Sequence, residues 1–181
     1  SIFVVLKFNM MREIQMVDLR AQYERIKGEI DGAIGAVLNS TAFIKGPEVG
    51  MFEEELKQYT GAEHVVSCGN GTDALQIAMM SLGLKPGDEV ITTNFTFVAT
   101  IEVVSLLGLK PVIVDPDPDT FNISAEAVRK AISPRTKAIV PVHLFGQCAD
   151  MENILGIAAK HGLFVVEDAA QATGTDYIFK N

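Results

Sequence analysis

Short apolar strands alternate with amphipathic helices along most of this 181-residue chain, and this alternation limits the possible folds more than any other feature. Five stretches rich in valine and isoleucine predict strands, at residues 64–68, 89–93, 111–115, 138–143 and 163–167. Helical patterns fill the intervals between them, near 72–82, 97–107, 124–132 and 150–161. Three glycines directly follow these helices, as C-terminal caps do: Gly83, Gly108 and Gly162.

The strands lack strict alternation of polar and apolar residues, which predicts that both faces of the sheet are buried. Repeated strand–helix–strand units predict a mostly parallel sheet with right-handed crossovers. We therefore expect an α/β fold with three layers, in which helices cover both faces of the sheet.

Two further helices are predicted before the alternation begins. Asp18 is placed to cap a helix whose apolar residues recur at spacings of three and four up to Leu38. A second helix is expected near 48–60, ending at Gly61. Residues 1–10 have neither the basic start nor the cleavage site of a signal peptide. We interpret them as a tag or an upstream-translated segment, with an added edge strand as the alternative.

Composition excludes several classes of partner. The net charge of -8 and the lack of a Lys/Arg cluster argue against nucleic-acid binding, and no apolar run is long enough to span a membrane. Cys68 and Cys148 show no metal-ligand spacing, which indicates a reducing, cytoplasmic setting and no metal site. The acidic stretch "DPDPDT" at 115–120 is interpreted as a turn rather than a metal loop.

Polar residues at the carboxyl ends of the predicted strands indicate a ligand site, because open α/β sheets bind ligands there. Asp168 stands just past the strand 163–167, so its carboxylate is expected to face the ligand. Glu167 is expected to point to the opposite side, since neighbouring side chains alternate along a strand. His143, at another strand end, is interpreted either as a ligand contact or as a structural histidine.

A glycine-rich turn leads from the first predicted strand into a helix, in "SCGNGTDAL" at 67–75. Free N–H groups at such a helix start attract a phosphate without a lysine. A dinucleotide site would also need an acidic residue at the end of the next strand, and "ITTNFTF" at 91–97 has none. A non-catalytic, doubly wound nucleotide-binding module therefore stays as a disfavoured alternative.

Two phenylalanines follow the same strand. Phe95 is expected in the core, whereas Phe97 is placed to cover the face of a flat heteroaromatic ligand. An anion cradle, a stacking ring and a carboxylate together suit pyridoxal phosphate, whose ring nitrogen needs a negative partner to stay protonated.

The chain resembles the DegT/DnrJ/EryC1/StrS family of sugar-nucleotide aminotransferases from about Met16 to Asn181. The resemblance rests on "VDLRAQY", "GPEV..FE", "GNGTDAL", "GDEVITTNFTFVAT", "PV.VD.DP.T.N", "VHLFGQCADM" and "VEDAAQA". It implies the large domain of an aspartate-aminotransferase-like fold that binds pyridoxal phosphate. The roles it implies are phosphate contacts at Gly71 and Thr72, ring stacking by Phe97, Asp168 at the pyridine nitrogen and Gln171 at the ring hydroxyl.

The resemblance also implies an activity. Members transfer an amino group, usually from glutamate, to a keto group on a nucleotide-linked sugar, in amino-sugar and polysaccharide biosynthesis. The motifs are most similar to members that aminate the 3-keto position, and related enzymes are cytoplasmic homodimers. A sugar-nucleotide dehydratase of the same fold, in which histidine replaces the catalytic lysine, is the alternative.

The Schiff-base lysine of the family is expected beyond Asn181. Lys180 is interpreted as a loop lysine, because it comes only twelve positions after Asp168 and lacks the preceding serine. We therefore expect residues 11–181 to be the N-terminal portion of the large domain, without the C-terminal domain. Such a chain would hold no catalytic residue of its own and would be inactive by itself.

Overall fold

The computed structural model describes residues 16–179. The segment 1–10, interpreted above as a tag or upstream-translated segment, and Lys180, interpreted as a loop lysine, lie outside the described residues. The chain divides into two compact units, Ser1–Glu54 and Glu55–Asn181, and each is described by itself.

A long helix, α1 (Leu19–Ser40), makes up most of the described part of the first unit. As expected, Asp18 caps it, since the Asp18 carboxylate accepts a hydrogen bond of 2.9 Å from the Ala21 N–H. The apolar residues form the predicted stripe along one face, and no α1 side chain is buried. Helix α2 (Pro47–Thr60) then begins with proline and ends before Gly61, as predicted.

The second unit is built around a four-stranded parallel sheet. Its strands are β1 (Glu89–Thr93), β2 (Lys110–Val114), β3 (Thr136–Val140) and β4 (Phe164–Val165). Their order in the sheet is β2-β1-β3-β4, so the central strands are β1 and β3. A single bridge between Val142 and Asp168 carries the pairing of β3 and β4 past their ends. The parallel α/β prediction is confirmed.

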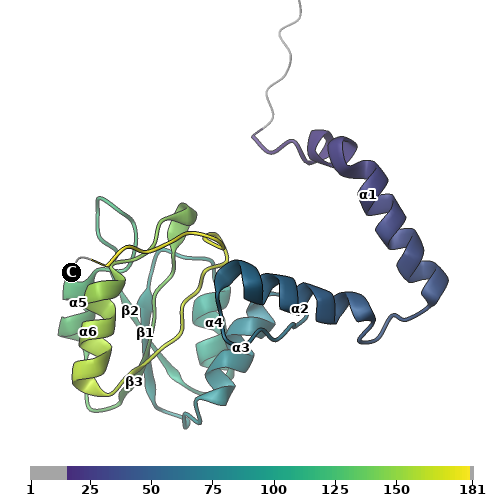
Figure 1. Ribbon diagram of the computed structural model, residues 1–181. Coiled ribbons are helices and arrows are strands. Elements are labelled where there is room, and N and C mark those ends of the chain that lie inside the picture. Colours follow the sequence, from purple (N-terminus) through teal and green to yellow (C-terminus); the bar gives the residue numbers. More distant parts are fainter. Residues whose placement is uncertain (1–15, 180–181) are drawn as a thin grey trace, which may run out of the picture. The chain divides into compact units, whose positions relative to one another are not determined.

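Helices cover both faces of this sheet, with α3 and α4 on one side and α5 and α6 on the other (Figure 1). Their bounds are α3 (Gly71–Ser81), α4 (Ala99–Leu106), α5 (Ala125–Ala131) and α6 (Met151–His161). Both the first and the last residue of each helix lie within about two residues of the predicted limits. Three glycines close α3, α4 and α6 with positive φ, as expected: Gly83, Gly108 and Gly162.

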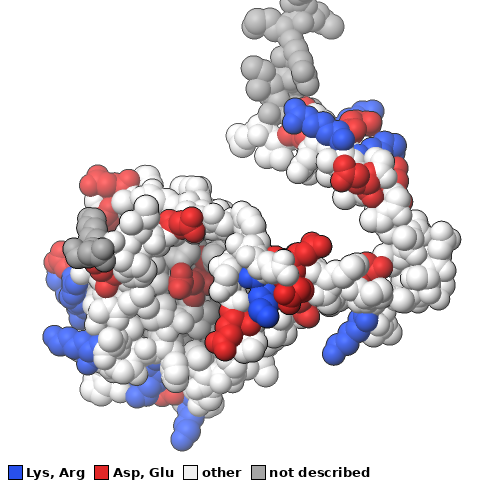
Figure 2. All heavy atoms as spheres, viewed as in Figure 1, with Lys and Arg blue, Asp and Glu red and all other residues white. Residues whose placement is uncertain are grey.

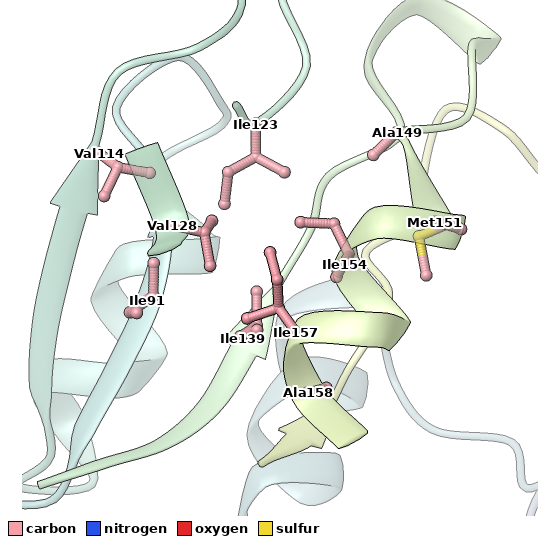
Figure 3. Packing of buried hydrophobic residues seen from close by; sticks show 10 residues of the cluster. All are labelled: Ile91, Val114, Ile123, Val128, Ile139, Ala149, Met151, Ile154, Ile157 and Ala158. Atoms are coloured by element: carbon pink, nitrogen blue, oxygen red, sulfur yellow. The ribbon is translucent and has the colours of Figure 1, made fainter. Parts of the chain in front are cut away.

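Two apolar clusters pack against opposite faces of the sheet, because successive strand residues point to opposite sides. Figure 3 shows one cluster, in which Ile91 and Ile139 from the central strands meet Ile154 of α6. Their neighbours Val90 and Val140 point the other way, into the cluster under α3 and α4. All five residues are fully buried, which explains why the strands read as continuous apolar runs.

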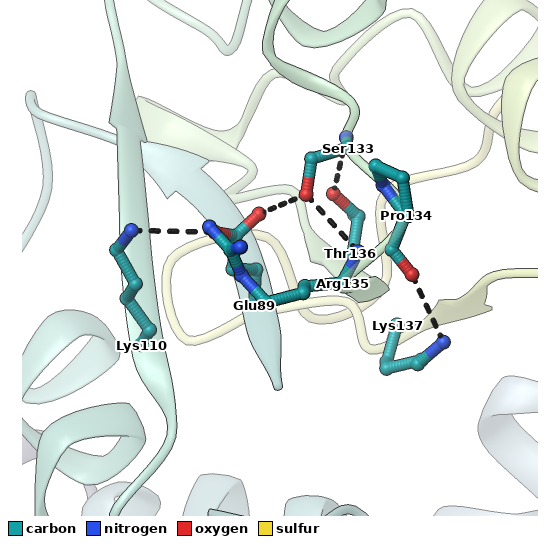
Figure 4. Close-up of polar contacts among 7 residues, drawn as sticks. All are labelled: Glu89, Lys110, Ser133, Pro134, Arg135, Thr136 and Lys137. Atoms are coloured by element: carbon teal, nitrogen blue, oxygen red, sulfur yellow. Dashed lines mark hydrogen bonds and ion pairs between the residues drawn. The ribbon is translucent and has the colours of Figure 1, made fainter. Parts of the chain in front are cut away.

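A buried carboxylate stabilises the amino-terminal end of the sheet (Figure 4). Glu89 accepts hydrogen bonds from the Ser133 hydroxyl and from Arg135, whose Nη2 lies 2.7 Å from Oε1. Lys110 adds an ion pair at 3.3 Å. The Ser133 and Arg135 hydrogen bonds, with a smaller contribution from Lys110, lower the pKa of Glu89 to about 2.

One predicted strand is wrong. Residues 64–68 adopt no regular secondary structure, although "HVVSC" has strong strand propensity. Propensity alone does not make a strand, since the backbone also needs a neighbouring strand to take up its hydrogen bonds. Within residues 16–179, the sheet consists of the four strands β1, β2, β3 and β4 alone, and Val66 is 80% exposed.

Figure 2 shows acidic side chains beside basic ones across the face in view, rather than one extended basic area. Within the described part of the chain, no helix is both long enough and apolar enough to cross a membrane.

Candidate active site

A cavity of about 520 Å³ opens in the second unit, beyond the carboxyl ends of the strands. Its wall comes from three parts of the chain: the start of α3, the segment 97–99, and the residues 167–173 that follow β4. The five residues predicted to bind a cofactor all lie in this wall: Gly71, Thr72, Phe97, Asp168 and Gln171.

The first turn of α3 presents free backbone donors to the cavity. Asn70 caps the helix, its side chain accepting a hydrogen bond of 3.0 Å from the Asp73 N–H. The Ala74 N–H makes the first bond of the helix, to the Asn70 carbonyl, so the N–H groups of Gly71 and Thr72 have no acceptor within the helix. A Cβ built on Gly71 would meet no atom within 4 Å. Packing within the protein therefore does not require glycine here, whereas a ligand that approaches the backbone closely would.

Asp168 places a buried carboxylate in the cavity wall, with only 8% of the residue exposed. Its Oδ1 accepts a hydrogen bond of 3.2 Å from the Ala170 N–H, and its Oδ2 accepts one of 2.8 Å from the Thr100 hydroxyl. Among residues 16–179, no lysine, arginine or histidine forms an ion pair with Asp168. A buried carboxylate without a cation is unusual, because burying an unpaired charge costs several kcal/mol.

Phe97 and Phe95 differ from each other in their surroundings. Phe97 is 73% exposed and lines the cavity, as predicted for a stacking ring. The core position expected for Phe95 is wrong, since that residue is 45% exposed. Its ring packs instead against Phe121 and Phe145, with ring centroids 5.7 Å and 6.4 Å away.

Gln171 is held in place by the loop after β3. Its Oε1 accepts a hydrogen bond of 2.8 Å from the Phe145 N–H. A backbone N–H can only donate, so this contact fixes the amide oxygen and leaves the Nε2 hydrogens to donate to a ligand.

The loop itself is anchored by Asn122, a buried side chain that sequence reasoning missed. Its amide accepts from the Leu144 N–H at 3.0 Å and donates to the carbonyls of Gln147 and Cys148, at 3.0 and 3.2 Å. These three partners lie more than 20 positions away in sequence, so no local sequence pattern predicts the contacts of Asn122.

His143 is a satisfied structural histidine, one of the two roles considered for it. The residue is 3% exposed, and its Nδ1 accepts from the Ala149 N–H at 3.1 Å. Nε2 therefore carries the proton and donates to the Glu167 carboxylate at 2.8 Å. This bond lowers the pKa of the Glu167 carboxyl. Glu167 does not turn wholly away from the cavity, since it contributes to its wall and to that of a neighbouring cavity.

Among residues 16–179, the remaining reactive groups do not form a second catalytic set. Burial raises the pKa of the Cys148 thiol, and the nearby carboxylates of Glu167 and Asp176 add to that effect, so the thiolate is disfavoured. Asp117 accepts two backbone bonds within its own turn, from Asp119 and Thr120, as expected for a turn. Within the described ranges, no three His, Cys, Asp or Glu side chains are grouped to hold a metal ion.

Comparison with known proteins matches the DegT/DnrJ/EryC1/StrS aminotransferase family model to residues 24–180. The chain belongs to this family. A curated family relative from Pseudomonas aeruginosa, named UDP-2-acetamido-2-deoxy-3-oxo-D-glucuronate aminotransferase, is 54% identical over 91% of this chain and 46% of its own length. The chain thus spans less than half the length of the curated relatives it matches.

Solved structures of family members share this fold. S. venezuelae DesV, in a complex with a ketimine intermediate, is 45% identical with a TM-score of 0.87, covering 89% of this chain and 43% of its own. Bacillus subtilis NtdA, with bound PMP cofactor, is 38% identical with a TM-score of 0.84, covering 91% of this chain and 39% of its own.

Proposed function

We propose that this chain is the cofactor-binding part of a pyridoxal-phosphate-dependent sugar aminotransferase. The observation that carries the proposal is the buried Asp168 carboxylate, which has no cationic partner among the described residues and shares a cavity with the free N–H groups at the start of α3. A ligand with a phosphate at one end and a protonated ring nitrogen at the other would satisfy both groups.

The described residues suit such a ligand in chemistry as well as in position. The N–H groups of Gly71 and Thr72 would bind the phosphate, and the glycine leaves room for its oxygens. Phe97 would cover one face of the ring, and the Nε2 of Gln171 would donate to the ring hydroxyl. Asp168 would hold a proton at the ring nitrogen. Pyridoxal phosphate, when bound, supplies a ring that accepts electrons from the reacting carbon.

The substrate is proposed to be a keto group, at the 3-position, on a nucleotide-linked sugar, with glutamate as the amino donor. The name of the Pseudomonas relative, a 3-oxo-sugar aminotransferase, supports this choice. The catalytic lysine is proposed to lie in sequence that follows Asn181 in the complete enzyme, together with the C-terminal domain. We further propose that the enzyme acts in the cytoplasm as a homodimer.

Substitution of Asp168 tests the proposal in the complete enzyme. Asp168→Asn keeps the shape of the side chain but removes its negative charge, and each unit lost from the ring nitrogen's pKa costs about 1.4 kcal/mol of preference for the protonated ring. We expect the rate of amino-sugar formation, measured by mass spectrometry, to fall by orders of magnitude. Cofactor affinity should fall much less, because the phosphate contacts remain.

Glu167→Gln is the matched control, since Glu167 is the adjacent carboxylate and bonds His143. It should change the rate far less than Asp168→Asn does. Equal rates for Asp168→Asn and the unmodified enzyme would refute the role of Asp168. Loss of a hydroxyl group from a keto-sugar substrate without gain of an amino group would identify the dehydratase instead.

A further inference from the structure

Two threonine hydroxyls form a chain of hydrogen bonds that ends at Asp168. Thr100 lies in the first turn of α4, and Thr96 precedes that helix. The Thr100 hydroxyl donates to Asp168 Oδ2 at 2.8 Å, and the hydroxyls of Thr96 and Thr100 are 3.2 Å apart. Thr96 lies in the bend before α4, and the contact between its hydroxyl and that of Thr100 joins this bend to the first turn of the helix. This arrangement links the segment that carries Phe97 to the carboxylate on the other side of the cavity wall.

The direction of these hydrogen bonds follows from valence. A carboxylate can only accept, so the single Thr100 hydroxyl proton is committed to Asp168. Thr100 must then accept from Thr96, which makes Thr96 the donor of the second bond. The two bonds therefore run in sequence from Thr96 to Thr100 and from Thr100 to Asp168 Oδ2, while the Ala170 N–H donates to Asp168 Oδ1.

The buried hydroxyl of Thr100 needs such a partner. The side chain is fully buried on α4, the helix that carries the buried Val103 and Val104. Valine has almost the same shape, so apolar packing alone would be met by valine at position 100. A buried hydroxyl without a hydrogen bond costs about 1–3 kcal/mol, so the bond to Asp168 is what makes threonine suitable here.

We propose that Thr100, oriented by Thr96, is a positioning residue that fixes the plane of the Asp168 carboxylate and aims its free lone pairs at the ring nitrogen of the cofactor. This inference rests on the proposed function of the cavity. Without the Thr100 hydroxyl, Asp168 keeps only the Ala170 N–H as a fixed donor, and its carboxylate can rotate about the Cβ–Cγ bond. The proton at the ring nitrogen then loses its aligned acceptor.

The test compares Thr100→Val with Thr100→Ser in the complete enzyme loaded with ¹⁵N-labelled pyridoxal phosphate. The ¹⁵N chemical shift reports the proton on the ring nitrogen directly. We expect Thr100→Val to shift this signal toward the unprotonated value and to lower kcat by roughly tenfold or more, the weight of one charge-assisted hydrogen bond, with a much smaller change in KM. Thr100→Ser, which keeps the hydroxyl, should restore both values.

Thr92→Val provides a matched control. Thr92 is also fully buried, but its hydroxyl donates to the Val140 carbonyl at 2.9 Å rather than to Asp168. This variant should lower stability without moving the ¹⁵N signal. A Thr100→Val enzyme with the unmodified ¹⁵N shift and kcat would overturn the proposal, as would a Thr92→Val enzyme that moves the signal equally.

A second measurement needs no cofactor. In a double-mutant cycle of Thr100→Val and Asp168→Ala, followed by urea unfolding, we expect coupling of about tenfold in the unfolding constant. Absence of coupling would refute the link between the two residues. Failure of the proposed function is distinguishable, because the unmodified enzyme would then show no protonated ring nitrogen even where the coupling is present.

Discussion

Removal of the Asn122 side chain should destabilise the protein and loosen the candidate site together. Asn122→Ala deletes three hydrogen bonds at once, those to the Leu144 N–H and to the carbonyls of Gln147 and Cys148. At about 1 kcal/mol for each buried bond, the expected loss is about 3 kcal/mol. Leu144 is buried, so in the variant its N–H has neither Asn122 nor water as an acceptor. The loss in unfolding free energy should therefore not be smaller than about 3 kcal/mol.

Urea unfolding measures this loss, with Asn94→Ala as the control. Asn94 is an exposed asparagine whose side chain donates one bond of 2.7 Å to Asp115, so its removal should cost less than about 1 kcal/mol. The Phe145 amide, which donates to Gln171, should also exchange its hydrogen faster in Asn122→Ala than in Asn94→Ala. Equal unfolding free energies for the two variants, or an unchanged Phe145 exchange rate, would refute the anchoring role of Asn122.

Three further outcomes are expected. Gly71→Ala should weaken pyridoxal phosphate binding by about tenfold or more in a fluorescence titration. Its unfolding midpoint should stay unchanged, because the added Cβ meets no protein atom within 4 Å, and unchanged affinity would contradict the close approach of a ligand to this backbone. The pKa of Glu89 is lowered from 4.5 to about 2, so the ionised Glu89 carboxylate stabilises the folded protein above pH 4.5, and this stabilisation is lost as the pH falls toward 2. Glu89→Gln should therefore flatten the stability–pH curve between these values, as measured by thermal unfolding. An unaltered curve would contradict the assignment. The 181-residue chain, mixed with pyridoxal phosphate and reduced with borohydride, should give no persistent adduct at Lys180 by peptide mass spectrometry, and a stoichiometric adduct there would overturn its interpretation as a loop lysine.

Local patterns predicted those elements whose signals are themselves local. The capping residue Asp18 and the closing glycines after the helices set helix limits within a turn, so α1 to α6 lie close to their expected positions. The glycine turn before α3 and the carboxylate after β4 were predicted to share one edge of the sheet, because all parallel strands end there. The structure brings Gly71 and Asp168 into one cavity wall, as that argument requires.

Contacts between distant parts of the chain were not predictable in the same way. The strand propensity of residues 64–68 carries no information about whether a partner strand lies beside it. Thr100 and Asn122 act through partners that are 68 and 22 or more positions away. A weak signal existed for Thr100, since Thr96 and Thr100 lie on either side of Phe97 in the sequence, but only the position of Asp168 shows what the Thr100 hydroxyl contacts.

The parallel sheet keeps two groups of polar residues apart. Glu89 and its partners stand at the amino-terminal edge, whereas Asp168 is level with residue 142, which lies two positions past Val140 and thus five residue steps beyond Glu89 in register. At ~3.3 Å per step the separation along the strands is about 16 Å, and the two groups share no hydrogen-bond partner. Substitutions this far apart generally have additive effects. Protein engineering could therefore raise thermal stability through substitutions at the amino-terminal end of the strands and change ligand preference through substitutions at the carboxyl-terminal end, each independently of the other.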